Sequence, residues 1–527
     1  MENQLVLIIV LLAGLALEYV LIRFLKKGFY ITLLFLTVFA ALAFYFLPNM
    51  LFLQTVLYAG LPLLFVAILL FVFVAKEENK THVEEKYRAI LDTKGYHLTL
   101  GNIRRGISII GSAGSGKTES VVHGLFQHLG AFGFCGVMHD YKNFEITEMA
   151  YPIFKETNKD FYIISFGPIY NRVNPIAPRY IPDEESVHEI SRVLLENLLE
   201  LKESGSTGAS KFFNDAVEGL IGGLIWRLKE DYPDYCTIPH MIALYQHLTT
   251  EELVAFLSDN TTSKAMANAF ISGVDSDRQT AGVKSTLANV FKKISTQKIF
   301  MVLSADEVPL NVNDPKTPSV ISVVNDPKKE TSLSPVIATI IHSITKQMSE
   351  RNRLSSFLLM EEAATLRLLN MHRIPATLRS YDIATIYVLQ DKVQNDMMYG
   401  DKASKAILSN LSYQFFGKAN DPDTAKYYER FFEIVKKETR SVSKGYSLSF
   451  DTRVTQGEKE VAKRRADTFY GLQQGEFVVF FDGKDKKVRF KMPQIKRELP
   501  QPMPIDADDL KANFERVHKE IRLIFNS

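Results

Sequence analysis

Hydrophobic residues dominate the start of the chain, where three nearly unbroken apolar runs follow one another. Leu5–Leu25, Phe29–Leu47 and Leu51–Ala75 are each about 20 residues long, the length that an α-helix needs to cross a bilayer. Buried core helices are the alternative, but they seldom come three in succession without polar faces. The pattern predicts a transmembrane region of about three helices over residues 1–78.

The charges around these runs predict their orientation. Arg23, Lys26 and Lys27 lie between the first two runs, and Lys76 follows the third. Because cytoplasmic loops are enriched in Lys and Arg, we expect Met1 outside and most of the chain in the cytoplasm. The first residues lack the basic segment of a cleaved signal peptide.

After Gly106, short apolar runs of β type alternate with helical patterns. Such strands, separated by helices, are typical of a parallel sheet that is covered on both faces. The predicted strands are Ile107–Ile110, Phe134–Met138, Phe161–Phe166, Val320–Val324, Phe357–Met360, Ile383–Leu389 and Tyr413–Phe416.

Between Pro182 and about Ile299 the strand pattern disappears. Apolar residues there recur at helical spacing, as at Val283, Leu287, Val290, Phe291 and Ile294. We therefore predict an α/β fold whose nucleotide-binding domain, residues 79–181 and 316–527, is interrupted by an all-α domain over 182–315.

The predicted strand Ile107–Ile110 leads into Gly111-x-x-x-x-Gly116-Lys117-Thr118, the spacing of a P-loop. Its glycines let successive backbone N–H groups surround phosphate oxygens. Lys117 would reach the β- and γ-phosphates of ATP, and the Thr118 hydroxyl would hold Mg²⁺. A chance glycine-rich turn is the alternative. The predicted nucleotide-binding residues are Gly111, Ser112, Ala113, Gly114, Ser115, Gly116, Lys117, Thr118 and Glu119.

Two glutamates end a later apolar strand, Phe357–Met360. A P-loop ATPase needs carboxylates opposite its lysine, one for the Mg²⁺ shell and one to polarise the attacking water. We assign Glu361 to the metal and Glu362 to catalysis, with Lys117 as the other catalytic group. The alternative is a solvated acidic turn at the end of a buried strand.

Two further residues flank the strand Ile383–Leu389. Gln390, at its carboxyl end, can sense the γ-phosphate, and Arg379, on the preceding turn, can reach a neighbouring subunit's nucleotide as an arginine finger. A capping glutamine and a surface arginine are the alternative interpretation.

Composition adds little to these motifs. With 62 Lys and Arg against 60 Asp and Glu, the net charge is only +2, so a nucleic-acid surface has to come from local clusters. Basic clusters near Tyr446, Phe450 and Phe490 are candidates for phosphate contact and base stacking, and a solvated surface is the alternative. Their members are Lys436, Lys437, Arg440, Lys444, Lys463, Arg464, Arg465, Lys484, Lys486, Lys487, Arg489 and Lys491. Cys135 and Cys236 are expected to be reduced thiols.

The order of motifs after Tyr96 resembles that of type IV secretion coupling proteins, the TraD/TraG-like membrane ATPases of conjugation. Besides the P-loop and the glutamate pair, the resemblance rests on Asp140-x-Lys142, Asn174-Pro175, Lys211-Phe-Phe-Asn-Asp-Ala216, Gln390-Asp-Lys-Val-Gln394 and Gly475-Glu476. It implies a homohexameric ring of RecA-like domains at the bacterial inner membrane. The implied partners are DNA, a relaxase or another secreted protein, and the components of the secretion channel.

The chain also departs from that family pattern. Glu361-Glu362 replaces the usual Asp-Glu, Tyr141 and Asn143 stand where Pro and Gly are usual, and three predicted spans replace two. Three functions therefore remain open: an ATP-driven DNA or nucleoprotein pump, a protein-loading ATPase, and a docking receptor with weakened hydrolysis. No Leu-Ser-Gly-Gly-Gln signature follows the P-loop, which argues against an ABC transporter.

Overall fold

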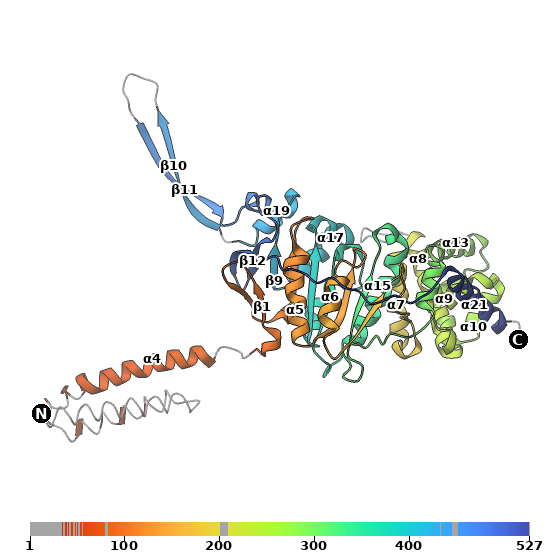
Figure 1. The fold of residues 1–527 in the computed structure, drawn as a ribbon, viewed down its shortest axis with the longest axis horizontal. Coiled ribbons are helices and arrows are strands. Elements are labelled where there is room, and N and C mark those ends of the chain that lie inside the picture. Colours follow the sequence, from red (N-terminus) through yellow and green to blue (C-terminus); the bar gives the residue numbers. More distant parts are fainter. Residues whose placement is uncertain are drawn as a thin grey trace. The chain divides into compact units, whose positions relative to one another are not determined.

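A computed structural model describes residues 56–78, 83–200, 209–432, 434–444 and 452–525, together with scattered positions between 34 and 54 (Figure 1). The chain divides into two compact units, residues 1–84 and 85–527. Each unit is described by itself.

The amino-terminal unit contains a π-helical turn, η1 (Val56–Gly60), which continues into helix α4 (Leu61–Glu78). These elements carry most of the third predicted span, Leu51–Ala75. The first predicted span, Leu5–Leu25, lies outside the described residues, and so does most of the second, Phe29–Leu47. Within the part of the chain that the structure describes, no helix combines the length and the apolar character that a membrane crossing requires.

A nine-stranded sheet forms the centre of the second unit, in the order β13-β12-β9-β3-β8-β7-β4-β6-β5. The strands from β9 to β5 run parallel, and β12 and β13 are antiparallel. Their bounds are β3 (Ile107–Ile110), β4 (Cys135–Asp140), β5 (Asp160–Ile164), β6 (Ser319–Val324), β7 (Ser356–Met360), β8 (Ile383–Leu389), β9 (Tyr413–Phe416), β12 (Glu476–Phe481) and β13 (Lys484–Arg489).

All the predicted runs are strands, and the α/β class with a parallel sheet is confirmed. The prediction succeeded because every residue of β3, β4, β6, β7, β8 and β9 is buried, so each of these strands contains an apolar core of residues. β8 lies between β3 and β7, and the chain then crosses β3 to form β9. The carboxyl ends around β3 are therefore the switch point at which open α/β sheets bind ligands.

Helices connect the strands of this sheet. After β3 come η4 (Lys117–Val122) and α5 (His123–Ala131), and α6 (Thr147–Phe154) joins β4 to β5. The remaining connections contain η7 (Pro327–Lys329), α15 (Glu330–Met348), η8 (Ala363–Thr365), α16 (Ile374–Arg379), α17 (Lys392–Tyr399), α18 (Asp401–Ser409), α19 (Pro422–Glu429) and α20 (Ala466–Tyr470).

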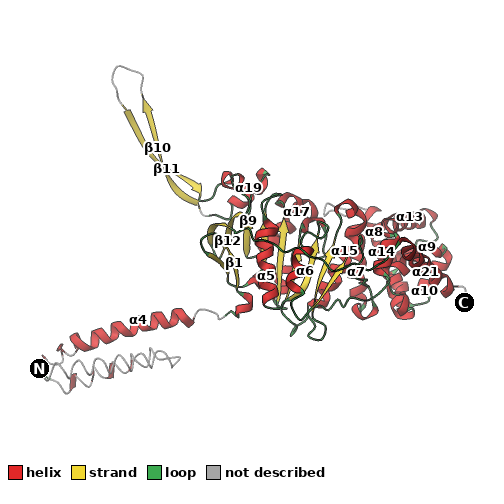
Figure 2. Cartoon of the chain, in the orientation of Figure 1, coloured by secondary structure: helices red, strands yellow, loops and turns green. Residues whose placement is uncertain are grey.

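The described residues between β5 and β6 form helices only, and these gather at one end of the unit (Figure 2). They are η5 (Pro178–Tyr180), α7 (Glu184–Leu198), α8 (Ala209–Asp231), η6 (Pro233–Tyr235), α9 (Ile238–His247), α10 (Thr250–Ser258), α11 (Thr261–Met266), α12 (Asn268–Ser272), α13 (Asp277–Ile294) and α14 (Gln297–Leu303). The stripe predicted on α13 is buried at every position. We call residues 184–303 the helical segment.

The carboxyl-terminal tail joins this helical segment to the sheet. After β13 it runs past α6 and β5, where the backbone N–H of Glu498 donates to Glu148 (3.0 Å) and that of Met503 donates to Ile169 (2.7 Å). It ends in α21 (Ala507–Phe525), which packs against α9 and α14. The last helix of residues 316–527 thus packs with the helical segment. The sequence pattern did not predict this packing.

Two small antiparallel sheets complete the unit. β1 (Ala89–Asp92) pairs with β2 (His97–Leu100), between η2 (Glu85–Tyr87) and η3 (Ile103–Arg105). β10 (Ile434–Lys444) pairs with β11 (Thr452–Ala462) in a long hairpin that forms a sheet of its own. Most residues of both strands are charged or polar, so the sequence has no apolar alternation that would predict this hairpin.

Candidate nucleotide-binding site

The loop between β3 and η4 has the backbone geometry of an anion cradle. Gly114 and Gly116 adopt positive φ angles of 73° and 85°. A Cβ atom at Gly116 would lie 2.9 Å from the backbone nitrogen of Gly475, and one at Gly111 would lie 3.2 Å from the Cα of Gly417. The glycines are therefore required both by backbone conformation and by close packing.

Neighbouring strand ends hold this loop in place. The backbone N–H of Gly111 donates to Leu389 (3.2 Å), and that of Ser112 donates to Lys418 (2.7 Å). From the segment before β12, the N–H of Gly475 donates to Ser115 (2.9 Å). These contacts come from both neighbours of β3 and from the closing hairpin β12–β13, so the whole switch point shapes the loop.

Lys117 begins the helical turn after the loop, and its side chain folds back over it. Nζ donates to the carbonyl oxygens of Gly111 (2.6 Å) and Ser112 (3.3 Å). Burial lowers the pKa of Lys117, and the negative charge of Glu362 opposes this shift. The adjacent Thr118 is also buried. Both side chains therefore border the loop that the sequence predicts to bind phosphate.

Two serine hydroxyls of the loop are buried without a partner. Within the described part of the chain, Oγ of Ser112 and Oγ of Ser115 neither donate nor accept a hydrogen bond. Unpaired buried polar atoms are costly, and phosphate oxygens are strong acceptors for such hydroxyls. The loop thus fits a polyphosphate by its polar atoms as well as by its backbone.

Glu361 follows β7, and its side chain turns toward the end of β4. Oε2 accepts from the backbone N–H of Tyr141 (3.2 Å), and Oε1 accepts from Nζ of Lys142 (3.3 Å). Burial raises the pKa of Glu361 to about 8, with a further contribution from the charge of Asp140. A nearby cation stabilises the ionised form of a carboxyl group that is held in this way, because positive charge favours ionisation.

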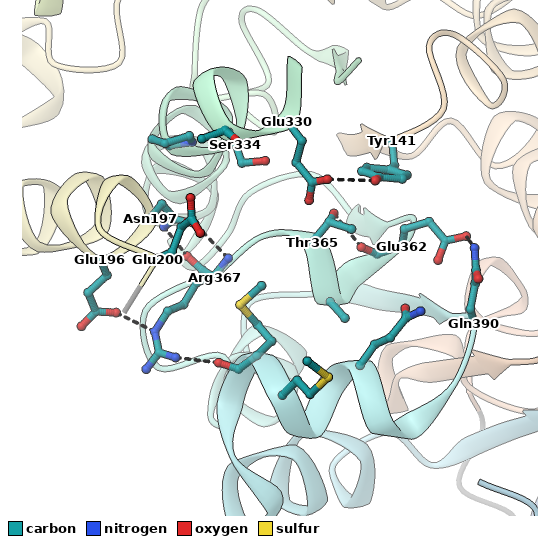
Figure 3. A pocket seen from close by; sticks show the side chains of 16 residues that line it. Tyr141, Glu196, Asn197, Glu200, Glu330, Ser334, Glu362, Thr365, Arg367 and Gln390 are labelled. Carbon is teal, nitrogen blue, oxygen red and sulfur yellow. Dashed lines mark hydrogen bonds and ion pairs between the residues drawn. The ribbon is translucent and has the colours of Figure 1, made fainter. Parts of the chain in front are cut away.

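Glu362 turns the other way, toward the end of β8. Its backbone is left-handed, with φ 44°. Oε1 accepts from Nε2 of Gln390 (3.0 Å), as Figure 3 shows, and lies 3.1 Å from Nζ of Lys142. The structure therefore brings the predicted residues Glu362 and Gln390 into direct contact, beside the loop that carries Lys117.

Lys142 is the main residue of this cluster that we did not predict as catalytic. It reaches both glutamates and also Glu145 (3.6 Å). Burial pulls the pKa of Lys142 down, but the charges of Glu361 and Glu362 outweigh burial, so the pKa is raised. The only signal in the sequence was its place in Asp140-x-Lys142.

Asp140 shapes the turn that carries Lys142. Its fully buried carboxylate accepts from the backbone N–H groups of Lys142 (3.2 Å), Ile146 (3.1 Å) and Thr147 (2.8 Å). Burial raises the pKa of Asp140 to about 6, against the lowering effect of these bonds. Asp140 thus positions the turn that carries Lys142, whose ammonium group lies near both glutamates.

Arg379 is placed differently from the other predicted residues. It is exposed and ends α16, just before β8, whereas Gln390 directly follows β8. A strand of this length spans about 20 Å. Within one chain, Arg379 therefore lies at the opposite sheet edge from the loop and the glutamates.

No group of three or more His, Cys, Asp or Glu side chains suited to a metal occurs among the described residues. A cation bound with a nucleotide needs no such cage, because Mg²⁺ keeps waters and phosphate oxygens and adds one or two protein ligands. The Thr118 hydroxyl and a glutamate carboxylate fit that requirement.

The basic clusters are partly neutralised. Lys463 and Arg464 both pair with Asp485, at 2.6 and 2.9 Å, and Lys487 pairs with Glu476 at 3.2 Å. Lys436, Lys437, Arg440 and Lys444 lie on β10.

Cys135 and Cys236 are free and buried, as predicted, and burial raises the pKa of their thiols to about 11 and about 12.

Comparison with known proteins identifies the family. Residues 73–500 match the family described as type IV secretory system conjugative DNA transfer. The chain matches no curated protein sequence.

Solved structures share the fold. The unbound bacterial conjugative coupling protein TrwBΔN70 superposes with a TM-score of 0.62 at 13% identity, covering 81% of this chain and 93% of that chain. TrwB in complex with ADP and Mg²⁺ gives 0.59 at 14% identity, covering 76% and 88%. TrwB with the non-hydrolysable ATP analogue ADPNP gives 0.57 at 14%, covering 76% and 89%. Since the family match spans most of the sequence and the fold agrees, the chain belongs to the type IV secretory system conjugative DNA transfer family.

Proposed function

We propose that this protein is a membrane-anchored ATPase that uses ATP and Mg²⁺ to deliver DNA or nucleoprotein into a type IV secretion channel. The observation that carries the proposal is the meeting of Lys117, Glu362, Gln390 and Lys142 around the carboxyl ends of β3, β7, β8 and β4. A glycine loop with a lysine, facing a carboxylate and a glutamine, is the arrangement that phosphoryl transfer needs.

Each side chain takes a defined part in the proposed reaction. Lys117 leaves the loop carbonyls to bind the β- and γ-phosphates, and Glu362 accepts a proton from the attacking water. Gln390 orients Glu362 through their hydrogen bond. Thr118 and Glu361 would hold Mg²⁺, which would supply positive charge to the phosphates. The nine residues from Gly111 to Glu119 form the proposed nucleotide site.

The proposed assembly is a homohexameric ring. The exposed position of Arg379, at the sheet edge away from its own P-loop, supports a role in a neighbouring subunit's site. The apolar runs of region 1–78 support a multi-pass inner-membrane location with a cytoplasmic body. Secretion channel components and a relaxase, or another secreted protein, are the proposed partners.

The test is ATP turnover by the purified full-length protein, with and without single- or double-stranded DNA, across a salt series. Stimulation by DNA that weakens with salt is expected, since phosphate contacts release counterions. Turnover that DNA does not change would favour a protein-loading ATPase. Nucleotide binding without turnover would favour a docking receptor.

The trans role of Arg379 predicts a specific rescue. Arg379→Ala should bind ATP normally but lose turnover by about 10³-fold, since an arginine finger stabilises charge only in the transition state. Mixing it with inactive Lys117→Ala subunits places an intact Arg379 beside an intact P-loop, so partial activity should return. Arg373→Ala, at the start of the same helix, is the control and should stay active. Mixed rings without activity would remove the proposed role.

Lys142 predicts a pH effect. Lys142→Met removes the cation beside Glu361, whose charge lowers the pKa of that carboxyl, so the pKa of Glu361 should rise further. Glu361 then ionises only at higher pH, and the acidic limb of the turnover profile should shift upward. We expect a loss of at least about 10-fold at neutral pH, which corresponds to about 1.4 kcal/mol. Lys329→Met, which removes an exposed pair with Asp326, should keep the profile of the unaltered protein. An unshifted acidic limb would show that Lys142 does not control the ionisation of the carboxylate.

A further inference from the structure

The short segment after Glu362 connects the candidate site to the helical segment. Thr365 fixes the start of this connection, since its N–H (2.9 Å) and its hydroxyl (2.8 Å) both donate to the carbonyl oxygen of Glu362. Tyr399 of α17 fixes the next residues, because its hydroxyl donates to Leu366 (2.9 Å) and accepts from the N–H of Leu368 (3.1 Å). Residues 365–368 are therefore hydrogen-bonded both to Glu362 and to α17.

Asn197, in the last turn of α7, also contacts this segment (Figure 3). Its Oδ1 accepts from the backbone N–H of Arg367 (3.1 Å), and its Nδ2 donates to the carbonyl oxygen of Arg367 (2.8 Å). A second Nδ2 bond, to Val193 (2.8 Å), anchors the amide to α7. One side chain thus grips both backbone groups of a residue that lies 170 positions away in the sequence.

The Arg367 side chain extends the contact. Nε donates to Glu196 of α7 (2.9 Å), and a terminal nitrogen donates to the carbonyl oxygen of Met398 (2.7 Å). Arg367 is only 17% exposed, and Glu196 is 13% exposed. We call the contacts of Asn197 and Glu196 with Arg367 the α7 clamp.

The clamp also receives contacts from the rest of the helical segment. Lys293 of α13 donates to the carbonyl oxygen of Leu198 (2.8 Å) and lies 3.6 Å from Glu200. The last turn of α7 is therefore attached to α13 on one side and to the Glu362 segment on the other. A cavity of about 540 Å³, whose lining includes Asn197, Arg367, Glu362 and Gln390, lies beside the clamp.

We propose that the α7 clamp sets the position of Glu362, so that the state of the helical segment controls the turnover rate while nucleotide affinity changes little. Asn197 and Arg367 are positioning residues in this proposal, because neither is assigned a contact with nucleotide. The inference rests on the proposed function and adds a route for its regulation. The same contacts run in both directions, so nucleotide that shifts Glu362 should also displace the last turn of α7 through the clamp.

A built-in probe makes this reciprocal effect measurable. Trp226, the single tryptophan of the chain, lies on α8 of the helical segment and is 8% exposed. Its emission reports on that segment alone. The full-length protein is titrated with Mg²⁺ and a non-hydrolysable ATP analogue, while calorimetry records binding and hydrogen exchange follows peptide 193–200.

In the unaltered protein, analogue binding should change the Trp226 emission and the exchange of peptide 193–200. Asn197→Ala should bind the analogue within about 2-fold of normal but lose at least half of both changes. Asn197→Asp, which keeps the acceptor for Arg367 and loses the donors, should show the same loss if the alanine variant folds poorly. In the same variants, single-stranded DNA should no longer change the turnover rate from its basal value.

The control is Asn260→Ala. Asn260 caps α11 by accepting from Thr262 (3.1 Å) and Ser263 (3.0 Å), so its loss weakens the helical segment without touching the Glu362 segment. It should keep both nucleotide-induced changes. Analogue binding without any change in the unaltered protein, or full changes in both Asn197 variants, would overturn the clamp. Absence of analogue binding in the unaltered protein would overturn the proposed function itself.

Discussion

Lys117→Ala is expected to abolish ATP turnover and to weaken nucleotide binding by at least 10-fold. A hydrogen bond to a charged group contributes about 1.5–3 kcal/mol, and Lys117 would make such bonds to the phosphates. Among the described residues, Nζ donates hydrogen bonds only to the carbonyl oxygens of Gly111 and Ser112 in its own loop, so truncation should leave the sheet intact. Calorimetry with an ATP analogue and a turnover assay measure the two effects.

Lys155→Ala is the matched control for this change. Lys155 is partly exposed and pairs with Glu498, away from the loop. Its replacement should leave affinity and turnover unchanged, and circular dichroism should show both variants folded. If Lys117→Ala retained normal affinity and normal turnover, the assignment of the P-loop would be wrong.

Glu362→Gln is expected to separate binding from hydrolysis. Glutamine keeps an oxygen that can accept from Gln390, and Lys142 keeps its pair with Glu361, so the local structure should survive. The lost proton acceptor should lower turnover by about 10²–10⁴-fold, the usual contribution of a general base. Calorimetry should show the analogue bound as before, and single-turnover kinetics should show that the chemical step has slowed.

Two glutamine variants test the specificity of this result. Glu330→Gln alters a carboxylate that accepts from the Tyr141 hydroxyl (3.0 Å) on the same cavity, and it should keep turnover within about 3-fold. Glu361→Gln should raise the Mg²⁺ concentration needed for half-maximal turnover, because Glu361 is assigned to the metal shell. Equal turnover in Glu362→Gln and the unaltered protein would exclude Glu362 as the base.

Local sequence patterns predicted the sheet well. β3, β8 and β9 have the predicted bounds, and β4 to β7 differ by a few residues at their ends. Burial on both faces of a parallel sheet makes such strands continuously apolar, so a short window of sequence is enough to recognise them. The hairpin β10–β11 had no such pattern, and its pairing came only from the structure.

The candidate site was predicted only in part. The P-loop was recognisable because a tight turn around phosphate demands glycines and a lysine at fixed spacing along one segment. Gln390 and Glu362 were predicted separately, and their contact follows from β8 lying between β3 and β7. Lys142 was not predicted as part of the catalytic group, since its relation to Glu361 and Glu362 depends on β4 being the next strand.

The sequence by itself therefore determined seven strands of the central sheet, the helical character of the segment after β5, the phosphate loop and the residue types available for chemistry, because these depend on neighbours within a few positions. Only the tertiary structure decided which distant residues meet. It placed Lys142 between two glutamates, joined Asn197 to Arg367, and attached α21 to α9 and α14. The physical reason is that strand order and helix packing bring together residues that are far apart in the chain, and no local pattern carries that information.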